Sequence, residues 1–160
     1  MILDKRGFDV TIYEKSNIIG GNYNLAAAFS FKDRDKLLLE WYKRELNKSN
    51  IEIKFNTDVK NIDFISSNAF AIIIATGSYS RKVLFDSDKV LSVPEFIIKN
   101  QKITNKEVLI IGGGLTGCEI ALELSKENKV TVVEIKDNLL EIDGLCNANK
   151  KFLLTALENN

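Results

Sequence analysis

Three consecutive segments in the second half of the chain alternate between two kinds of hydrophobic pattern. Residues 108–111 form a short apolar run that ends at a glycine, which is typical of a buried parallel strand. Residues 115–127 have helical spacing, with Leu115, Cys118 and Leu122 on one apolar stripe. A second apolar run covers residues 130–133. The pattern therefore predicts a strand–helix–strand unit over residues 106–134.

The beginning of the chain repeats the last part of this unit. Residues 1–6 are predicted to be the last turn of a helix, with Gly7 at its C-cap. Residues 8–13 alternate as a strand that runs into Glu14, and FDVTIYEK here resembles NKVTVVEI near residue 134. The repeat predicts a second unit of the same kind, of which only the later part is present.

The intervening residues contain further periodic segments. Residues 32–47 are predicted to form a helix in which Trp41 and Tyr42 belong to the core rather than to a stacking platform. Residues 51–55 alternate as a strand, residues 61–68 form a turn-rich connection, and residues 69–75 are a solid apolar strand.

The remaining segments are more polar. Residues 81–105 are predicted to be irregular with one short helix, which has Pro94 in its first turn. A polar loop is expected over residues 136–149 and the start of a helix over residues 150–157. The fold class that follows is α/β, with two partial Rossmann-like dinucleotide-binding units and mostly parallel sheets.

Composition excludes several classes of protein. The 160 residues include 22 Lys+Arg and 22 Asp+Glu, so no basic excess points to nucleic acid or to an anionic membrane. No apolar stretch approaches the ~20 residues of a membrane span, and we expect a cytoplasmic protein. Histidine is absent, and the two cysteines do not have metal-binding spacing, so no metal site is predicted. Cys118 is interpreted as a small core residue, whereas no partner can be named for Cys146.

The glycines that follow residue 111 indicate the chemistry. Gly112, Gly114 and Gly117 fit G-x-G-x-x-G, and Glu134 lies about 20 residues further on. In such a motif the first glycine allows a tight turn, the second admits a pyrophosphate and the third lets the helix pack closely on the strand. The acid can accept hydrogen bonds from an adenosine ribose. The alternative is a glycine-rich turn that binds nothing.

Two further glycines follow the first acid. Gly20 and Gly21 mark a tight turn or a close approach of the backbone to a ligand. An ordinary loop is the alternative, but the position next to a predicted ribose-binding acid favours contact with a cofactor.

Three segments, VTIYEKSNIIGGNYNLAA, IIIATG and VLIIGGGLTGCEIALEL, together resemble the FAD/NAD(P)-binding region of the pyridine nucleotide-disulfide oxidoreductases. The chain is most similar to 2,4-dienoyl-CoA reductase and trimethylamine dehydrogenase-like NADH:flavin oxidoreductases. The resemblance covers nearly the whole chain. The segment with Asn22 favours this subgroup, which usually has glutamine at that position.

The resemblance implies two cofactors, FAD and NAD(H). No residue of this chain qualifies as a catalytic acid or base, so none is predicted. Residues implied to contact FAD are Glu14, Gly21, Asn22, Val59, Ala75, Thr76 and Gly77. Residues implied to bind NAD(H) are Gly112, Gly114, Gly117 and Glu134.

The same resemblance implies a division into three parts. Residues 1–80 would be a partial FAD-binding domain without its first strand and glycine loop, residues 81–105 a crossover, and residues 106–160 a partial NAD(P)-binding domain. The expected function is that of a fragment that passes hydride from NADH to FAD inside a longer enzyme with a flavin-binding barrel, and we expect the chain alone to be inactive. The alternative is a nucleotide-binding remnant without redox activity.

Overall fold

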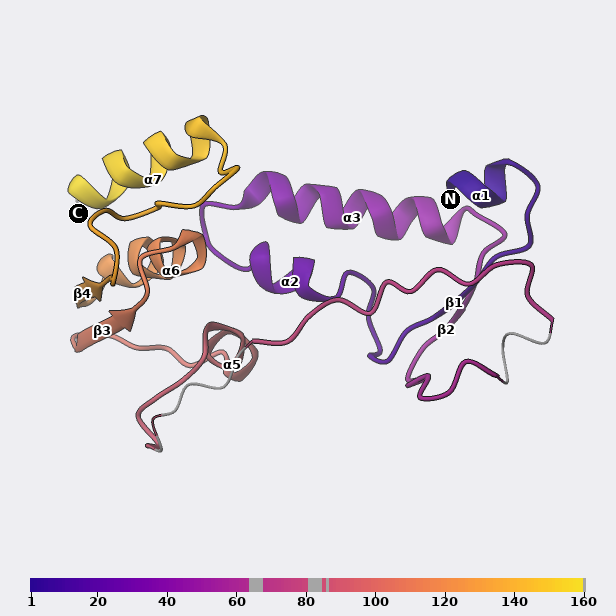
Figure 1. The fold of residues 1–160 in the computed structure, drawn as a ribbon, viewed down its shortest axis with the longest axis horizontal. Helices are drawn as coiled ribbons and strands as arrows, with labels where there is room; N and C mark the ends of the chain where they lie inside the picture. Colours follow the sequence, from indigo (N-terminus) through magenta and orange to yellow (C-terminus); the bar gives the residue numbers. More distant parts are fainter. Residues whose placement is uncertain (64–67, 81–84, 86, 160) are drawn as a thin grey trace. The chain divides into compact units, whose positions relative to one another are not determined.

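The computed structural model describes residues 1–63, 68–80, 85 and 87–159. Parts of the predicted connection at 61–68 and of the predicted crossover at 81–105 lie outside these residues. The chain divides into two compact units (Figure 1). Unit 1 comprises Met1–Ala28 and Lys32–Arg81, and unit 2 comprises Phe29–Phe31 and Lys82–Asn160. Each unit contains its own two-stranded parallel sheet, which confirms the predicted fold class.

Unit 1 begins with a short helix and a strand, as the sequence predicts. Helix α1 (Ile2–Lys5) ends at Gly7, whose φ of 85° allows the left-handed turn. The Gly7 N–H donates to the Asp4 carbonyl (2.9 Å) and the Phe8 N–H to the Leu3 carbonyl (3.1 Å), the pattern of a Schellman cap. Strand β1 (Thr11–Tyr13) follows.

The second strand of unit 1 lies beside the first. Strand β2 (Glu52–Lys54) pairs with β1 in parallel, with Ile12 opposite Ile53. Between the two strands run α2 (Asn22–Ala26), which was not predicted, and α3 (Asp33–Asn47), which was. Acidic residues in the first turn of α3 and Arg44 in its last turn complement the helix dipole. The buried apolar residues of unit 1 are Ala27, Leu39, Leu46 and Ile51.

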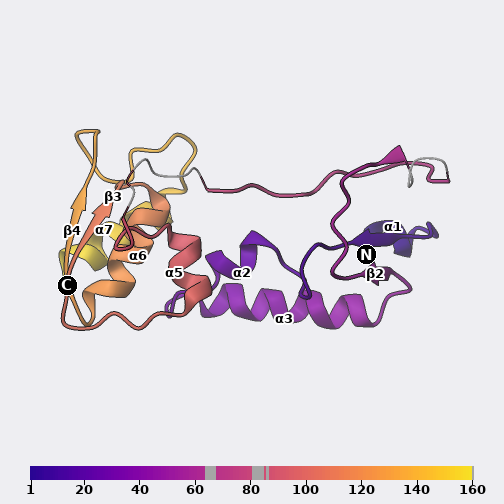
Figure 2. The ribbon, with the colours of Figure 1, turned by 90° about the horizontal axis from the view of Figure 1, so that it is seen from below.

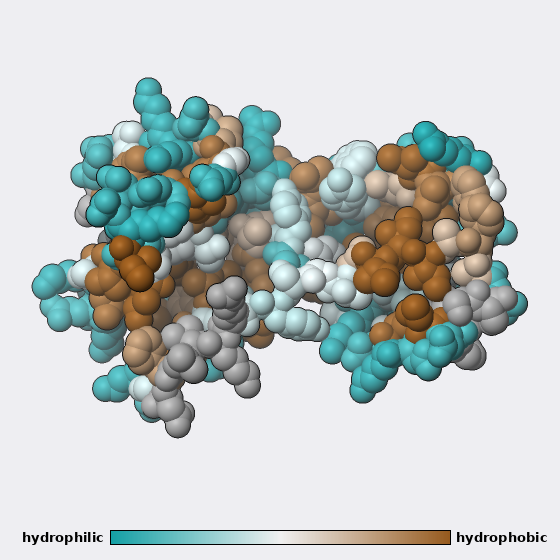
Figure 3. Space-filling view, viewed as in Figure 1, coloured by the Kyte–Doolittle hydropathy of each residue, from teal (hydrophilic) through white to brown (hydrophobic). Residues whose placement is uncertain are grey.

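The prediction of a strand over residues 69–75 is wrong. This segment is irregular, and Phe70, Ile73 and Ile74 expose 96%, 73% and 73% of their surface. A strand requires a neighbour that shares its backbone hydrogen bonds, and no described residue pairs with this segment. Its apolar composition therefore remains on the surface, and Figure 3 shows apolar side chains gathered on the visible face of unit 1.

The prediction that Trp41 and Tyr42 belong to the core is also wrong. They expose 42% and 41% of their surface and contact each other edge to face, with ring centroids 5.0 Å apart. Tyr42 lines an open apolar groove of about 380 Å³ along α3. The groove is lined by Ile19, Gly20, Tyr23, Leu38, Leu39, Tyr42, Lys43 and Leu46. The helix therefore carries a wider apolar surface than the described part of unit 1 covers.

Unit 2 contains the predicted strand–helix–strand. Strand β3 (Glu107–Ile111), helix α6 (Leu115–Ser125) and strand β4 (Lys129–Val133) follow one another, and the strands pair in parallel from Glu107 opposite Lys129 to Ile111 opposite Val133. Figure 2 shows both arrows pointing the same way. Helix α6 packs on this sheet. The helix contributes Ile120, Ala121 and Leu124 to the buried core between them.

Two more helices cover α6 and the sheet. Helix α5 (Val93–Lys99) starts as predicted, with Pro94 in its first turn and a capping box between Ser92 and Glu95. Its Phe96 and Ile97 pack against the sheet core. Helix α7 (Asn147–Glu158) begins earlier than predicted and packs on α6 through Leu153.

The prediction of a polar loop over residues 136–149 is wrong in one respect. Leu140 lies within this loop, yet it is 1% exposed and packs with Cys118, Leu122 and Leu153. Its φ is 56°, a left-handed conformation that is unusual for a bulky residue. The loop is therefore anchored in the core of unit 2 by a residue in a strained conformation.

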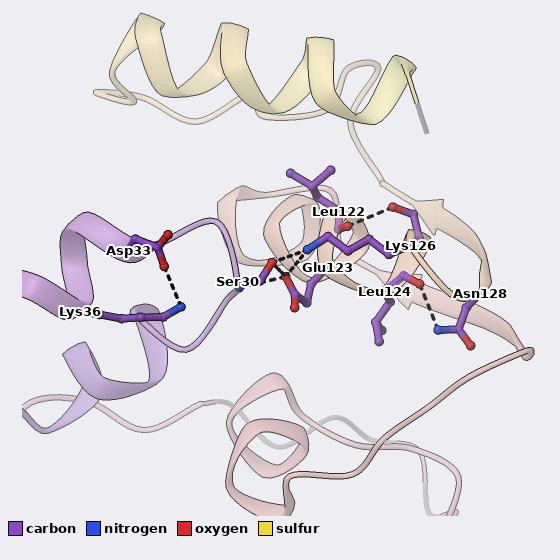
Figure 4. A network of polar contacts seen from close by, with 9 residues as sticks. Ser30, Asp33, Lys36, Leu122, Glu123, Leu124, Lys126 and Asn128 are labelled. Carbon is purple, nitrogen blue, oxygen red and sulfur yellow. Dashed lines mark hydrogen bonds and ion pairs between the residues drawn. The ribbon is translucent and has the colours of Figure 1, made fainter.

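A polar network holds the short segment Phe29–Phe31 in unit 2 (Figure 4). The Ser30 N–H and Oγ donate to Glu123 Oε2 at 3.1 and 2.8 Å, and Lys126 Nζ donates to both partners. Partial burial tends to raise the pKa of Glu123, but hydrogen bonds from Ser30 and Lys126 outweigh it and lower the pKa. Phe29, 4% exposed, is thereby held in the core beside Ile110.

Candidate functional site

The turn between β3 and α6 requires glycine at its first and last motif positions for reasons internal to the protein. Gly112 has a φ of 106°, and its N–H extends the ladder by donating to the Val133 carbonyl (2.8 Å). A Cβ on Gly117 would lie 1.8 Å from the Gly112 carbonyl oxygen. Gly112 therefore makes the turn, and Gly117 lets the helix approach it.

Neither the backbone conformation nor the packing within the protein requires glycine at position 114. Gly114 is the N-cap of α6 with a φ of −74°, which any residue can adopt. A Cβ there would meet only the Ile142 Cδ1 atom, at an ordinary contact distance of 3.7 Å. The space beside Gly114 lies at the N-terminus of an 11-residue helix, where free N–H groups and the dipole favour an anion. These features fit a pyrophosphate that passes close to the backbone.

Gly113, between the motif glycines, is a site residue that the sequence reasoning missed. Its N–H donates to Glu134 Oε2 at 2.5 Å, and its carbonyl accepts the Leu140 N–H at 2.8 Å. A Cβ on Gly113 would lie 2.3 Å from Leu139 Cδ2. The signal was visible as a third consecutive glycine, but the contacts depend on a loop about 25 residues away, which no sequence motif predicts.

Glu134 lies at the end of β4 with its carboxylate against the glycine loop. Besides the bond from Gly113, its Oε1 accepts the N–H groups of Ile135 (2.9 Å) and Lys136 (3.0 Å). The backbone N–H of Lys136, followed by that of Gly113, lowers the pKa of this carboxyl below its ordinary value. The structure therefore brings Gly112, Gly114, Gly117 and Glu134 together around one loop with a fixed negative charge.

The first predicted ribose-binding acid has a comparable place in unit 1. Glu14 follows β1, and its Oε1 accepts the Ser16 N–H and Oγ, each at 2.7 Å. The Thr57 N–H donates to the Glu14 carbonyl (2.9 Å), and Lys15 pairs with Asp58 (3.0 Å). The loop after β2, which contains the predicted adenine neighbour Val59, is thus tied to the end of β1. No described residue donates to Glu14 Oε2, so this oxygen can accept a ribose hydroxyl.

The remaining residues predicted to contact FAD are only partly assembled. Asn22 Nδ2 donates to the Ser78 carbonyl at 2.8 Å, which places Gly21 and Asn22 next to Gly77. Gly77 has a φ of 73° and turns the chain there. Ala75, Thr76 and Val59 are exposed, and within the described residues no hydrogen bond joins them to Glu14. Gly21 and Asn22 thus come together with the chain segment that ends at Gly77, whereas no described hydrogen bond links this group to Glu14 or Val59.

Among residues 1–63, 68–80, 85 and 87–159, no group of three or more histidine, cysteine, aspartate or glutamate side chains is arranged to hold a metal ion. In the same part of the chain no helix has the length and apolarity needed to cross a membrane.

The parallel strands, the glycine turn and the acid at the end of β4 define an α/β protein of the dinucleotide-binding type. Comparison with known families gives the particular one. The model of the pyridine nucleotide-disulphide oxidoreductase family matches residues 3–160, and the chain belongs to this family. FAD and NAD(P) are the cofactors of that family, which agrees with the cofactors that the sequence implied.

The following three relatives are much longer proteins than this chain. The cinnamate reductase of Clostridium sporogenes is 37% identical over 158 residues, which cover 97% of this chain and 24% of the reductase. The NADH oxidase of Thermoanaerobacter brockii is 31% identical over 84% of this chain and 22% of its own length. A solved complex of 2-naphthoyl-CoA reductase with 2-naphthoyl-CoA matches with a TM-score of 0.77 and 26% identity, covering 97% of this chain and 24% of that one. The chain therefore spans about a quarter of the length of these relatives.

Proposed function

We propose that this chain is the electron-input part of a flavin-dependent NADH oxidoreductase. NADH docks at the glycine loop of unit 2, and its hydride passes to an FAD held by residues of unit 1. The observation that carries the proposal is Gly114. Neither its backbone conformation nor its packing requires glycine, so the room beside it is best explained by a ligand that approaches the backbone.

Different residues of unit 2 bind different parts of NADH. The N-terminus of α6 and the amide of Gly114 offer N–H groups and a positive dipole end to the pyrophosphate. Glu134 accepts a hydrogen bond from the adenosine ribose while it holds Gly113. NADH supplies the hydride, and the protein supplies position and electrostatics.

The residues of unit 1 fit one part of an FAD. Glu14 offers Oε2 to the adenosine ribose, Val59 lies on the loop beside it, and Gly21, Asn22 and the Ala75–Thr76–Gly77 segment lie along the rest of the cofactor. Residues 1–10, which lie before β1, contain no glycine motif. The domain bounds proposed for these roles are residues 1–80 for FAD and 106–160 for NAD(H), with a crossover at 81–105.

The final electron acceptor belongs to the remainder of a larger protein. The relatives include a cinnamate reductase and a 2-naphthoyl-CoA reductase. In each of them, about three quarters of the chain lies outside the part that matches this protein. We propose that the remainder carries a flavin-binding barrel where an unsaturated organic substrate is reduced. Unit 2 would then deliver electrons to that barrel through FAD.

A second function is a nucleotide-binding module without redox chemistry. The unpaired apolar segment at residues 69–75 favours it, because unit 1 as described does not enclose an FAD. Visible absorbance of the proposed larger protein separates the two, since a protein that holds FAD is yellow and loses this colour when NADH reduces the flavin, whereas a nucleotide-binding module does neither.

Titration calorimetry with NADH tests the proposed function. Wild type is expected to bind, and Gly114→Val is expected to lose at least about tenfold in affinity, because the side chain occupies the pyrophosphate position. Cys146→Val is the matched control, since Cys146 is the exposed N-cap of α7 and the same side chain is introduced there. Equal NADH affinity in all three proteins, or no binding by the wild type, would overturn the proposal.

A further inference from the structure

The carbonyl of Gly113 receives hydrogen bonds from two separate parts of unit 2. The Leu140 N–H donates from the loop after β4 at 2.8 Å, and the Cys118 thiol donates from α6 with Sγ at 3.3 Å. A carbonyl oxygen has two lone pairs, so these donors use its full capacity. Burial, aided by the charges of Glu134 and Glu119, raises the pKa of the Cys118 thiol and keeps its proton in place.

This arrangement fixes the direction of the next amide. The peptide bond that joins Gly113 and Gly114 is planar and trans, so its C=O and N–H point in opposite directions. With the carbonyl turned toward Cys118 and Leu140, the Gly114 N–H points to the opposite side of the loop. No acceptor for that N–H is present among the described residues. Two glycines in succession would otherwise leave this peptide free to rotate.

The Leu140 N–H is held in place although the backbone conformation of Leu140 is energetically unfavourable. A left-handed φ of 56° is unfavourable for a leucine, yet the residue is 1% exposed and packs on Cys118 and Leu153. Strained conformations of this kind persist where the surroundings enforce them, and they are concentrated at functional sites. Here the burial of the Leu140 side chain keeps its N–H directed at Gly113.

We propose that Cys118 and Leu140 are positioning residues of the nucleotide site, which orient the Gly113–Gly114 peptide so that the Gly114 N–H faces the pyrophosphate. The inference rests on the proposed function, since it assigns a task in NADH binding to residues that touch no part of the nucleotide. Cys118 therefore does more than fill a small space in the core. Its thiol proton is the feature that matters, and serine is the closest replacement that keeps a donor.

Calorimetry with NADH provides the first test. Cys118→Ala removes the donor, and it is expected to weaken NADH binding about two- to threefold, the low end of the net value of a hydrogen bond, because a thiol is a weak donor. Cys118→Ser keeps a donor and should recover most of that loss. Leu124→Ala, in the core of α6 but without contact to Gly113, is the control, which should lower the unfolding midpoint and leave NADH affinity unchanged.

A second readout reports on the peptide itself, without nucleotide. When glycine alone carries ¹³C-carbonyl and ¹⁵N labels, carbonyl–amide correlations arise only from the consecutive pairs 20–21, 112–113 and 113–114. In Cys118→Ala the 113–114 correlation should shift, and Cys118→Ser should move it back toward the wild-type position. The 20–21 correlation in unit 1 serves as an internal reference and should stay in place.

The outcomes separate this inference from the proposed function. If the wild type binds NADH and Cys118→Ala binds it equally well, the positioning role is wrong and the proposed function stands. An unshifted 113–114 correlation in Cys118→Ala would also overturn the positioning role. If the wild type binds no NADH, the proposed function fails and the role of both residues fails with it.

Discussion

The carboxylate of Glu134 accepts the backbone N–H of Gly113 at 2.5 Å, which ties the end of β4 directly to the glycine loop. The two residues lie at the carboxyl ends of adjacent parallel strands, where ligands of open α/β sheets bind. Because the N–H groups of Ile135 and Lys136 also point at this carboxylate, its charge is fixed before any nucleotide arrives. Glu134 thus holds the glycine loop in its conformation, and in the proposed function it also binds the ribose.

This geometry predicts a preference for NADH over NADPH. A 2′-phosphate carries between one and two negative charges and would lie against the ionised Glu134. Lys136 does not offset this, because its Nζ donates to the Glu141 carbonyl at 2.6 Å. We expect the wild type to bind NADH at least about tenfold more tightly than NADPH.

The measurement is a pair of dissociation constants at equal ionic strength, for the wild type and for Glu134→Ala. The substitution should weaken NADH binding, because Gly113 loses its acceptor, but it should bring the NADH/NADPH ratio close to one. An unchanged ratio would show that another group selects the cofactor.

A pH dependence of stability follows from the same carboxyl. Its pKa is lowered in the folded state, so its contribution to stability is fully present above its ordinary value of 4.5. That contribution is lost as the pH falls from 4.5 through the lower folded value. Urea unfolding from about pH 6 to about pH 3 should therefore show a smaller loss for Glu134→Gln than for the wild type. If the unfolding free energies of the two proteins fall equally as the pH is lowered, Glu134 does not contribute to the loss of stability in acid.

The strand–helix–strand of unit 2 could be predicted because its signals are local. The apolar runs at β3 and β4, the helical spacing of α6 and the glycines between them all lie within about 30 residues, the length of one such unit. The positions of Gly112, Gly114, Gly117 and Glu134 followed from the same spacing. The helical spacing also identified Cys118 as buried, although not the bond that its thiol makes.

The features that could not be predicted depend on residues far apart in the sequence. The apolar run at 69–75 reads as a strand, but strand formation depends on a neighbour, and no described residue pairs with it. The exposure of Trp41 depends on what covers α3, which helical periodicity does not reveal. The strained Leu140 follows no turn signal, because its conformation is enforced by packing against α6 and α7.

The glycines of the loop should separate folding from binding. Gly117→Ala places a Cβ 1.8 Å from a backbone oxygen, which cannot move as a side chain can, so we expect a loss of about 3 kcal/mol in unfolding free energy. Gly114→Ala meets only an ordinary contact, and we expect a loss of about 1 kcal/mol or less. Urea unfolding of both variants makes the comparison. Equal losses would contradict the distinction between an internal and a ligand-based need for glycine.

Charged substitutions in the exposed segment at residues 69–75 should leave the stability of the fold nearly unchanged. Ile73 and Ile74 are each 73% exposed and lie in an irregular segment, so replacing both by lysine removes no buried contact. We expect unfolding free energy to change by less than about 0.5 kcal/mol and self-association to decrease. Sedimentation velocity at several concentrations measures the association. The double substitution Leu39→Lys and Leu46→Lys, on the buried side of α3, is the contrasting variant that should unfold unit 1.

The last prediction is that the 160-residue chain purifies essentially free of FAD. Phosphate contacts at a glycine loop and helix N-terminus anchor a dinucleotide, and no such motif precedes β1. The contacts expected from unit 1 are one free oxygen of Glu14, the Gly21–Asn22 turn beside Gly77, and an exposed loop with Val59. These groups could recognise the adenosine end, but they leave the pyrophosphate in water. The visible spectrum of protein purified from riboflavin-supplemented cells, together with chromatography of the heat-released cofactor, measures the occupancy. NADH binding by the same preparation is the control, because it shows that unit 2 is folded and competent. One tightly retained FAD per chain would show that unit 1 holds the flavin without a glycine loop of its own.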